Sequence, residues 1–327
     1  MSSAAGNAVL TVAGLSVGVR DLRLVTDVSF SLGPGERVGL IGESGSGKSL
    51  TALSLMGLLP EGLRAAGSVR MAAVDHDLVD ASEREMTRVR GDRMAMVFQE
   101  PMTALNPLMR VGDQVAEVML LHDTQPDRRS ARAAVTELFQ RVHLPDPERM
   151  PGSYPHQLSG GQRQRIMLAI ALANNPSVLI CDEPTTALDV TVQALMLEEI
   201  LAGVEREGSA LLFITHDLPV VAMVCQRVLV MYGGRLVESG PVREVFTSPR
   251  HPYTAGLLAS SRFEESDTAG RLPTISGSVP AAGHFPAGCP FRDRCPAATE
   301  ECAEWPGWTG GAAHGFACWH PVGRTGQ

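Results

Sequence analysis

A glycine-rich loop that ends in lysine and serine constrains this chain more than any other part of its sequence. The loop fits the pattern G-x-x-x-x-G-K-[ST], and its residues are Gly42, Glu43, Ser44, Gly45, Ser46, Gly47, Lys48 and Ser49. The apolar run 37–41 before it predicts a strand, and the apolar-periodic segment 50–59 after it predicts a helix. Because this pattern binds phosphate when it lies between a strand and a helix, the sequence predicts a phosphate-binding loop.

The residue types of this loop suit the phosphates of a nucleotide. Glycines allow successive backbone N–H groups to point at one anion, and the helix that follows presents its positive end to the same place. We expect Lys48 to reach the β- and γ-phosphates and the Ser49 hydroxyl to bind Mg²⁺. The loop therefore predicts a site for a nucleotide with Mg²⁺.

A pair of acids is the second feature with chemical content. Asp182 and Glu183 directly follow the apolar run 177–181, which predicts a buried strand. Open α/β sheets bind ligands at the carboxyl ends of their strands, so both acids are expected at that edge. Asp182 is suited to bind Mg²⁺ directly or to orient the groups that bind it. Glu183 is suited to orient and deprotonate the water that attacks the γ-phosphate.

The rest of the chain alternates predicted strands and helices. Strands are expected at 210–215 and 227–231, a helix at 190–205, and a mostly helical insert at 76–175. This alternation implies a largely parallel sheet that is covered on both faces. Beyond about Pro241 the prolines become frequent and the alternation fades, which predicts a small, irregular second domain.

Composition limits the classes of partner. Lys and Arg number 28 against 36 Asp and Glu, so the net charge of −8 provides no sequence-wide basic field for nucleic acid or anionic lipid. No apolar run approaches the length of a membrane helix, and the N-terminal residues lack the pattern of a secretory signal. We therefore expect a cytosolic chain unless a partner anchors it, with no nucleic acid as partner.

A third motif decides which kind of nucleotide site this is. It is the segment LSGGQ at 158–162, followed by the helical stretch 163–174. Together with the phosphate loop and the segment DEPTTALD at 182–189, it resembles the ATP-binding cassette signature of the nucleotide-binding subunits of that transporter family. The three motifs occur in the family's order over roughly residues 10–245.

The resemblance implies a fold and a division of the chain. The fold class is α/β, a P-loop NTPase cassette with a mainly parallel core sheet, a helical signature subdomain and a small, irregular, Cys-rich C-terminal domain. The cassette would span 1–245, with its helical subdomain at about 100–175, and the extension would span 246–327.

The resemblance also implies a second chain. In the family, each ATP lies between the phosphate loop of one subunit and the signature of its partner in a head-to-tail dimer. Small residues ahead of a helix leave N–H groups and a Ser hydroxyl free for phosphate, and the signature residues that would do this are Ser159, Gly160, Gly161 and Gln162.

Three further roles come from the same resemblance. Gln99 matches the glutamine loop, which senses the γ-phosphate and Mg²⁺ and joins the sheet to the helical insert. Asp189 matches the aspartate loop that crosses the dimer interface, and His216 matches the switch histidine that contacts the γ-phosphate.

The chain departs from the family pattern in two places. The family stacks the adenine on an aromatic residue near the first strand, but residues 15–19 read LSVGV; the guanidinium plane of Arg20 or Arg23 could take the place of that ring. Leu50 follows Ser49 in the nucleotide loop where a second Thr is common, although the Mg²⁺ ligand itself is intact.

The C-terminal tail narrows the resemblance. The segments HPYT at 251–254 and RLPTISGSVP at 271–280, with the cysteine-rich end, resemble the extension of oligopeptide and dipeptide importer ATPases. A loop-rich tail with four thiols indicates a metal site, and the resemblance implies a 4Fe–4S cluster; zinc, free thiols and disulfides remain alternatives. The four candidate ligands are Cys289, Cys295, Cys302 and Cys318.

These features together predict the ATPase subunit of a membrane importer. The resemblance implies a second ATP-binding cassette subunit, two membrane permease subunits, an external solute-binding protein and a peripheral place at the cytoplasmic face of the membrane. Peptides are the expected cargo, and nickel or another small solute is the alternative within the family. A soluble cassette ATPase that acts on nucleic acid or ribosomes is the alternative from another class. A regulatory module that binds ATP without cleaving it is opposed by Glu183 and His216.

Overall fold

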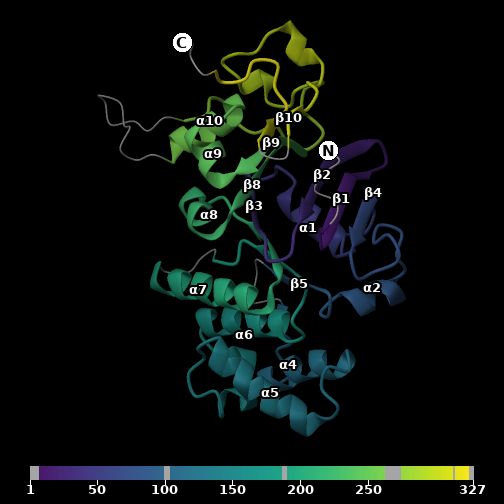
Figure 1. The fold of residues 1–327 in the computed structure, drawn as a ribbon, viewed down its shortest axis with the longest axis vertical. Coiled ribbons are helices and arrows are strands. Elements are labelled where there is room, and N and C mark those ends of the chain that lie inside the picture. The colour runs from purple at the N-terminus through teal and green to yellow at the C-terminus, as the bar shows by residue number, and fades with distance from the viewer. Residues whose placement is uncertain (1–6, 99–103, 186–189, 262–273, 312–313, 324–327) are drawn as a thin grey trace.

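The computed structural model describes residues 7–98, 104–185, 190–261, 274–311 and 314–323 (Figure 1). A small antiparallel sheet near the N-terminus has the strand order β2-β1-β4. Its strands are β1 (Leu10–Val19), β2 (Leu22–Leu32) and β4 (Arg64–Met71).

The larger sheet has the strand order β10-β11-β9-β8-β3-β7-β6-β5. Its middle strands β8, β3, β7, β6 and β5 pair in parallel, and β9, β11 and β10 continue the sheet antiparallel at one edge. The bounds are β3 (Arg37–Ile41), β5 (Met94–Val97), β6 (Val178–Asp182), β7 (Ala210–Ile214), β8 (Arg227–Tyr232), β9 (Arg235–Pro241), β10 (Thr309–Gly310) and β11 (Gly315–Phe316). The predicted α/β fold with a mainly parallel sheet is confirmed.

Helices lie on both sides of this sheet, and the helices of the 111–172 region continue the molecule beyond one end of it (Figure 1). They are α1 (Lys48–Leu55), α2 (Glu83–Val89), α4 (Val111–Leu121), α5 (Arg128–Arg141), α6 (Gly160–Leu172), α7 (Val190–Glu207), α8 (Leu218–Val224), α9 (Val242–Thr247) and α10 (Pro252–Ser260). Short 3-10 turns are η1 (Met150–Gly152), η2 (Pro155–Gln157), η4 (Arg292–Arg294) and η5 (Glu300–Ala303). None of the described helices is long and apolar enough to cross a membrane.

The period of the apolar residues explains these elements. On α5, Ala131, Val135, Leu138 and Phe139 are buried, which is the i, i+4, i+7, i+8 spacing of one helix face. The Asp127 side chain accepts from the N–H groups at the start of the helix and so caps it.

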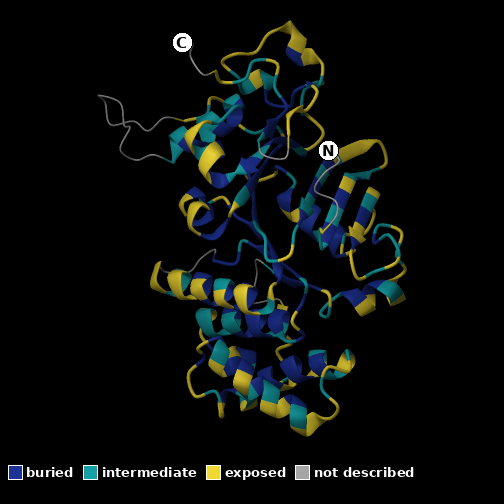
Figure 2. Ribbon diagram, in the orientation of Figure 1, coloured by how far each residue is buried: buried dark blue, intermediate teal, exposed yellow. Residues whose placement is uncertain are grey.

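Alternate residues of each central strand face two different cores. Leu211 and Phe213 of β7 belong to the core shared with the helices of the 111–172 region, whereas Leu212 and Ile214 belong to the core shared with the antiparallel sheet. Figure 2 shows the central strands in dark blue, between helices whose outer faces are yellow. This two-sided burial is what a parallel sheet needs.

Two predictions about elements were wrong in part. The segment 76–175 contains the buried strand β5, whose four residues are too few to show a strand period. The first helix is α1, which begins at Lys48 and ends well before residue 59, because Gly57 follows with a φ of 61°.

The described part of the C-terminal extension contains the helix α10, short 3-10 turns and the two-residue strands β10 and β11, and it is built onto the main sheet. Phe316 of β11 pairs with Glu238 of β9. Cys289 and Phe291 are buried in the same core as the helices and central strands. The extension therefore lies directly against the cassette (Figure 1).

A buried acid on α7 adds a pH dependence to this fold. The Glu199 side chain is 1% exposed, and its carboxylate has no hydrogen-bond partner among the described residues. Arg165 Nε and His143 Nδ1 each lie 3.6 Å from its Oε1. Burial raises the pKa of Glu199 from 4.5 to about 7 despite the nearby Arg165 charge, so the folded chain favours the neutral acid.

We expect Glu199→Gln to flatten the pH profile of stability. The pKa is higher in the folded state, so the contribution of Glu199 is complete below pH 4.5 and is lost as the pH rises through about 7. Between pH 5 and pH 8 the free energy of unfolding should shift in favour of the variant by about 3 kcal/mol. Denaturant unfolding at several pH values measures this, with the exposed Glu205→Gln on the same helix as control. Parallel profiles for wild type and Glu199→Gln would contradict the expectation.

Candidate functional site

The predicted phosphate loop connects β3 to α1, as its motif requires. Gly42 and Gly47 have φ values of 152° and 102°, which favour glycine, and a Cβ on Gly42 would collide with the Met231 carbonyl of β8. The N–H groups of Gly45 and Gly47 donate to no backbone group of the described chain. These donors and the first turn of α1 therefore offer an anion site.

Lys48 lies against this loop in a buried position. Its side chain is folded so that Nζ donates to the Gly42 carbonyl at 2.8 Å and to the Glu43 carbonyl at 3.0 Å. Burial lowers the pKa of Lys48, and the nearby carboxylates of Glu183, Asp182 and Glu43 oppose that shift. The Lys48 ammonium therefore lies near Asp182 and Glu183, the two acids that the sequence predicts for the same site.

Asp182 forms the end of β6 and is 4% exposed. Desolvation raises its pKa, and a hydrogen bond from the Ser49 hydroxyl opposes that rise. Its Oδ1 has no hydrogen-bond partner in the described structure. A carboxylate oxygen without a partner beside a serine hydroxyl fits Mg²⁺, which prefers oxygen ligands.

Glu183 and His216 meet at the next strand end. Glu183 has a φ of 47°, a conformation that costs a non-glycine residue about 1–3 kcal/mol. Its N–H donates to the Ile214 carbonyl of β7 at 2.9 Å, and its Oε1 lies 3.2 Å from His216 Nδ1. The His216 side chain is 67% exposed, so its ring is open to a ligand.

The site lies at the carboxyl edge of three neighbouring strands. The loop follows β3, Asp182 and Glu183 end β6, and His216 follows β7, which pairs between them. This is where open α/β sheets bind ligands. The structure therefore brings together the loop, both acids and the histidine that the sequence singled out.

The signature motif lies elsewhere in the chain. Ser159 caps α6: its hydroxyl accepts the Gln162 N–H at 3.3 Å, and the Gln162 side chain accepts the Ser159 N–H at 2.8 Å. Ser159 and Gly160 are exposed. No hydrogen bond or ion pair between described side chains links this motif to the phosphate loop, and Figure 1 places α6 beside α7 in the lower half and α1 in the upper half.

The roles of four residues singled out in the sequence stay predictions. Gln99 and Asp189 lie outside the described residues, so their roles stay predictions. Arg20 and Arg23 are exposed at the turn between β1 and β2, and their stacking on adenine stays a prediction as well.

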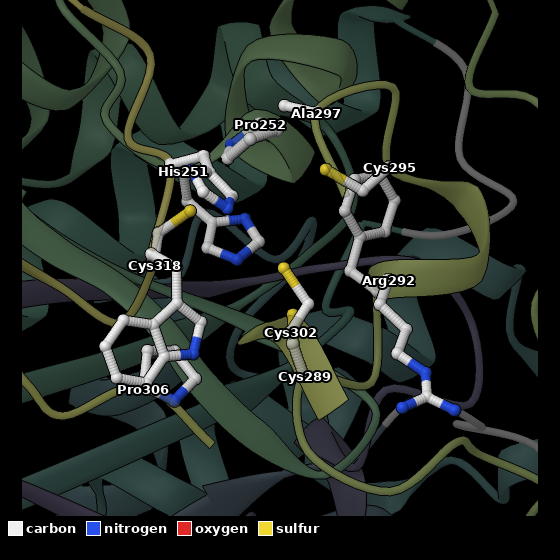
Figure 3. Close-up of a pocket in the computed structure, with 12 residues that line it drawn as sticks. His251, Pro252, Cys289, Arg292, Cys295, Ala297, Cys302, Pro306 and Cys318 are labelled. Atoms are coloured by element: carbon white, nitrogen blue, oxygen red, sulfur yellow. The ribbon is translucent and has the colours of Figure 1, made fainter. Parts of the chain in front are cut away.

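The four tail cysteines line one pocket together with His251 (Figure 3). Burial raises the pKa values of Cys289 and Cys318 to about 11, and the charges of neighbouring cysteines among the four add to both shifts. No three His, Cys, Asp or Glu side chains in the described ranges are arranged to hold a metal ion. The four thiols thus line one pocket, but their arrangement in the described structure supports neither a zinc ion nor a 4Fe–4S cluster.

His251 lines this pocket and has one ring nitrogen without a hydrogen-bond partner in the described structure. The residue is 1% exposed, its Nδ1 accepts the Tyr253 N–H at 3.0 Å, and its Nε2 has no partner in the described structure. Burial lowers the pKa of His251 to about 3, so the ring is neutral and its proton lies on Nε2.

Two residues of the extension reach the phosphate loop, and sequence reasoning did not find either contact. Tyr253 Oη accepts the Glu43 N–H, and the Arg294 guanidinium pairs with the Glu43 carboxylate. Tyr253 lies in the HPYT segment and Arg294 precedes Cys295, but no local pattern relates these positions to the loop.

Comparisons with known proteins agree with this site. A family model described as ABC transporter matches residues 25–186, and one described as oligopeptide/dipeptide transporter, C-terminal region, matches residues 237–302. A putative peptide import ATP-binding protein of Brucella ovis is 50% identical over 293 residues, 86% of each chain. A probable D,D-dipeptide transport ATP-binding protein, DdpD of Escherichia coli, is 45% identical over 304 residues, 92% of each chain.

A solved structure shares the fold. The ATP-binding cassette MJ0796, in a dimer bound to ADP and Pi, has a TM-score of 0.63 and 26% identity, over 72% of this chain and 99% of its own. Sequence relatives, fold and site geometry agree. The chain belongs to the ATP-binding subunits of the ABC transporter family, in the group that carries the oligopeptide/dipeptide transporter C-terminal region.

Proposed function

We propose that this chain is the ATP-hydrolysing subunit of a membrane importer for peptides such as di- and oligopeptides. The observation that carries the proposal is the site at one sheet edge, where the phosphate loop with Lys48 lies near Asp182 and Glu183, and Glu183 contacts His216. The C-terminal match and relatives named for peptide and dipeptide import support the cargo.

Different residues bind the phosphates, bind Mg²⁺ and activate water in ATP hydrolysis. The loop N–H groups and Lys48 bind the β- and γ-phosphates, while Ser49 and Asp182 hold Mg²⁺, which neutralises charge on the phosphates. Glu183 orients the attacking water and accepts its proton. His216, 3.2 Å from Glu183, binds the γ-phosphate and keeps the carboxylate in place.

Closure of two cassettes couples this chemistry to transport. The exposed Ser159 and Gly160 of a second cassette, with its Gly161 and Gln162, complete the site on the γ-phosphate, and loss of that phosphate removes the contact. Gln99 and Asp189 belong to the same proposal. The dimer of the related cassette MJ0796 bound to ADP and Pi supports it.

The partners of this subunit follow from the same proposal. They are a second cassette, either a copy or a paralogue, two membrane permease subunits and an external solute-binding protein. The subunit would lie at the cytoplasmic face of the membrane, held there by the permeases.

Uptake by cells that lack this chain tests the proposal. Loss of labelled di- and oligopeptide uptake, restored by the wild-type chain but not by Glu183→Gln, is the expected result. Unchanged peptide uptake together with lost nickel uptake would reassign the cargo. If RNA or DNA stimulated ATP hydrolysis by the purified chain, and no permease co-purified with it, the transporter role would be rejected.

We also propose a 4Fe–4S cluster in the pocket of Cys289, Cys295, Cys302 and Cys318. A cluster is wider than a single ion, so its four thiolates need not converge on one point, and the common pocket that the four cysteines line supports a shared site. The Nε2–H of His251 is a donor suited to a thiolate or sulfide.

Elemental analysis of anaerobically purified protein tests this cluster. We expect about four iron and four sulfide per chain with broad visible absorption, and loss of both in Cys302→Ser. Zinc without iron would support the alternative ion, and absence of both metals would reject a metal site.

A further inference from the structure

We propose that Arg294 of the C-terminal extension is a positioning residue of the phosphate loop, which it holds through Glu43. The extension would then be part of the nucleotide site. This goes beyond the proposed function, in which only the cassette residues hold ATP.

The contact between Arg294 and Glu43 is a two-bond ion pair. Arg294 Nη1 donates to Glu43 Oε2 at 2.8 Å, and Nη2 donates to Oε1 at 3.2 Å. The Arg294 side chain is only 6% exposed, and its bond to Glu43 is the main cause that raises the pKa of the guanidinium. Paired bonds between a guanidinium and a carboxylate fix orientation as well as distance.

Arg294 is itself held in place. Its Nε donates to the Ser276 carbonyl at 2.9 Å, Nη1 also donates to Tyr232 Oη at 3.2 Å, and Nη2 also donates to the Gly277 carbonyl at 3.4 Å. The guanidinium is therefore oriented by the extension and by the end of β8 before it contacts the loop. Such preorganisation reduces the entropy cost of holding Glu43.

A second contact holds the main chain of the same loop residue. The Glu43 N–H donates to Tyr253 Oη at 2.8 Å. Tyr253 is fully buried, and its ring centroid lies 4.6 Å from that of Tyr232 and 5.4 Å from that of Phe291. Glu43 is thus held at its backbone by the Tyr253 hydroxyl and at its side chain by the Arg294 guanidinium, and aromatic packing fixes the Tyr253 ring.

Glu43 transmits this support to the phosphate-binding groups. Its carbonyl accepts from Lys48 Nζ at 3.0 Å and from the Ser46 N–H at 3.2 Å. Its carboxylate is close enough to affect the pKa of Lys48. Without Arg294, an unpaired and partly buried carboxylate would stand beside the site of the phosphates and would repel them.

A pair of variants in the full-length chain separates this role from simple support of the fold. Arg294→Met should weaken binding of Mg²⁺–ATP by about tenfold or more, measured as the equilibrium dissociation constant. Arg294→Lys keeps the charge but lacks the planar fork, so an intermediate loss is expected. The double variant Arg294→Met/Glu43→Gln should bind ATP more tightly than Arg294→Met, because the repelling charge is gone.

The matched control is Arg243→Met. Arg243 is exposed on α9 and lies in neither the phosphate loop nor the cysteine pocket. This variant should have a dissociation constant for ATP within about twofold of the wild-type value.

Two results would overturn the inference: an unchanged dissociation constant in Arg294→Met, or a double variant no better than the single one. Should Arg294→Met fail to fold, normal ATP affinity in Arg294→Lys would overturn it equally. Normal peptide uptake with weakened ATP affinity would leave the proposed function standing, so the two can fail separately.

Discussion

Glu183→Gln should reduce ATP turnover by about 10²–10⁴-fold while ATP affinity stays close to that of the wild type. The amide keeps the size of the side chain and can still lie 3.2 Å from His216, but it cannot accept a proton from water. The left-handed backbone of Glu183 and its bond to β7 aim the side chain at the site, and neither depends on the carboxylate. The variant should therefore bind ATP and remain in the closed dimer.

Steady-state phosphate release and equilibrium ATP binding measure the two effects. Glu198→Gln, an exposed acid on α7, is the control and should turn over ATP as the wild type does. Hydrolysis by Glu183→Gln near the wild-type rate would remove Glu183 from its role as base.

Lys48→Ala should weaken ATP binding itself, by roughly a hundredfold, which is the upper range for hydrogen bonds to charged groups. Lys48 is buried beside three carboxylates, Glu183, Asp182 and Glu43. Its removal would delete the charge that attracts the γ-phosphate and leave those acids to repel it.

Equilibrium binding of Mg²⁺–ATP to the wild type and the variants measures this loss, and labelling of the wild type gives an independent check because Lys48 is the only lysine in the sequence. An amine-reactive probe can label Lys48 and the N-terminal amine alone, and Mg²⁺–ATP should protect Lys48 but not the N-terminus. Lys48→Arg is the matched variant, which keeps the charge and should lose less affinity than Lys48→Ala. Normal affinity in Lys48→Ala would contradict the phosphate-loop assignment.

The cassette part of the site could be predicted because its signals are local. The loop and the acid pair each follow a short apolar run, so the sequence places them at one sheet edge. His216 also follows such a run, but its role was inferred from the family resemblance. A single chain does not test the role of the signature, because Ser159 is proposed to act on the nucleotide of a second chain.

The contacts of the extension could not be predicted for the opposite reason. Arg294 and Glu43 are separated by 251 positions, and neither lies in a periodic segment that would reveal a partner. The same holds for β11, whose two residues show no alternation and yet pair with β9. β5 was missed because a short, fully buried strand has the same apolar sequence as part of a helix.

Measuring the mass of the Glu183→Gln chain in solution with Mg²⁺–ATP, alone and mixed with its second cassette, tests whether two chains share the nucleotide. Such sharing predicts that ATP, but not ADP, converts single chains into dimers, and that chains which also carry Ser159→Arg form no dimers. Full occupancy by Mg²⁺–ATP on a lone chain, with the second cassette present and Ser159 intact, would contradict it.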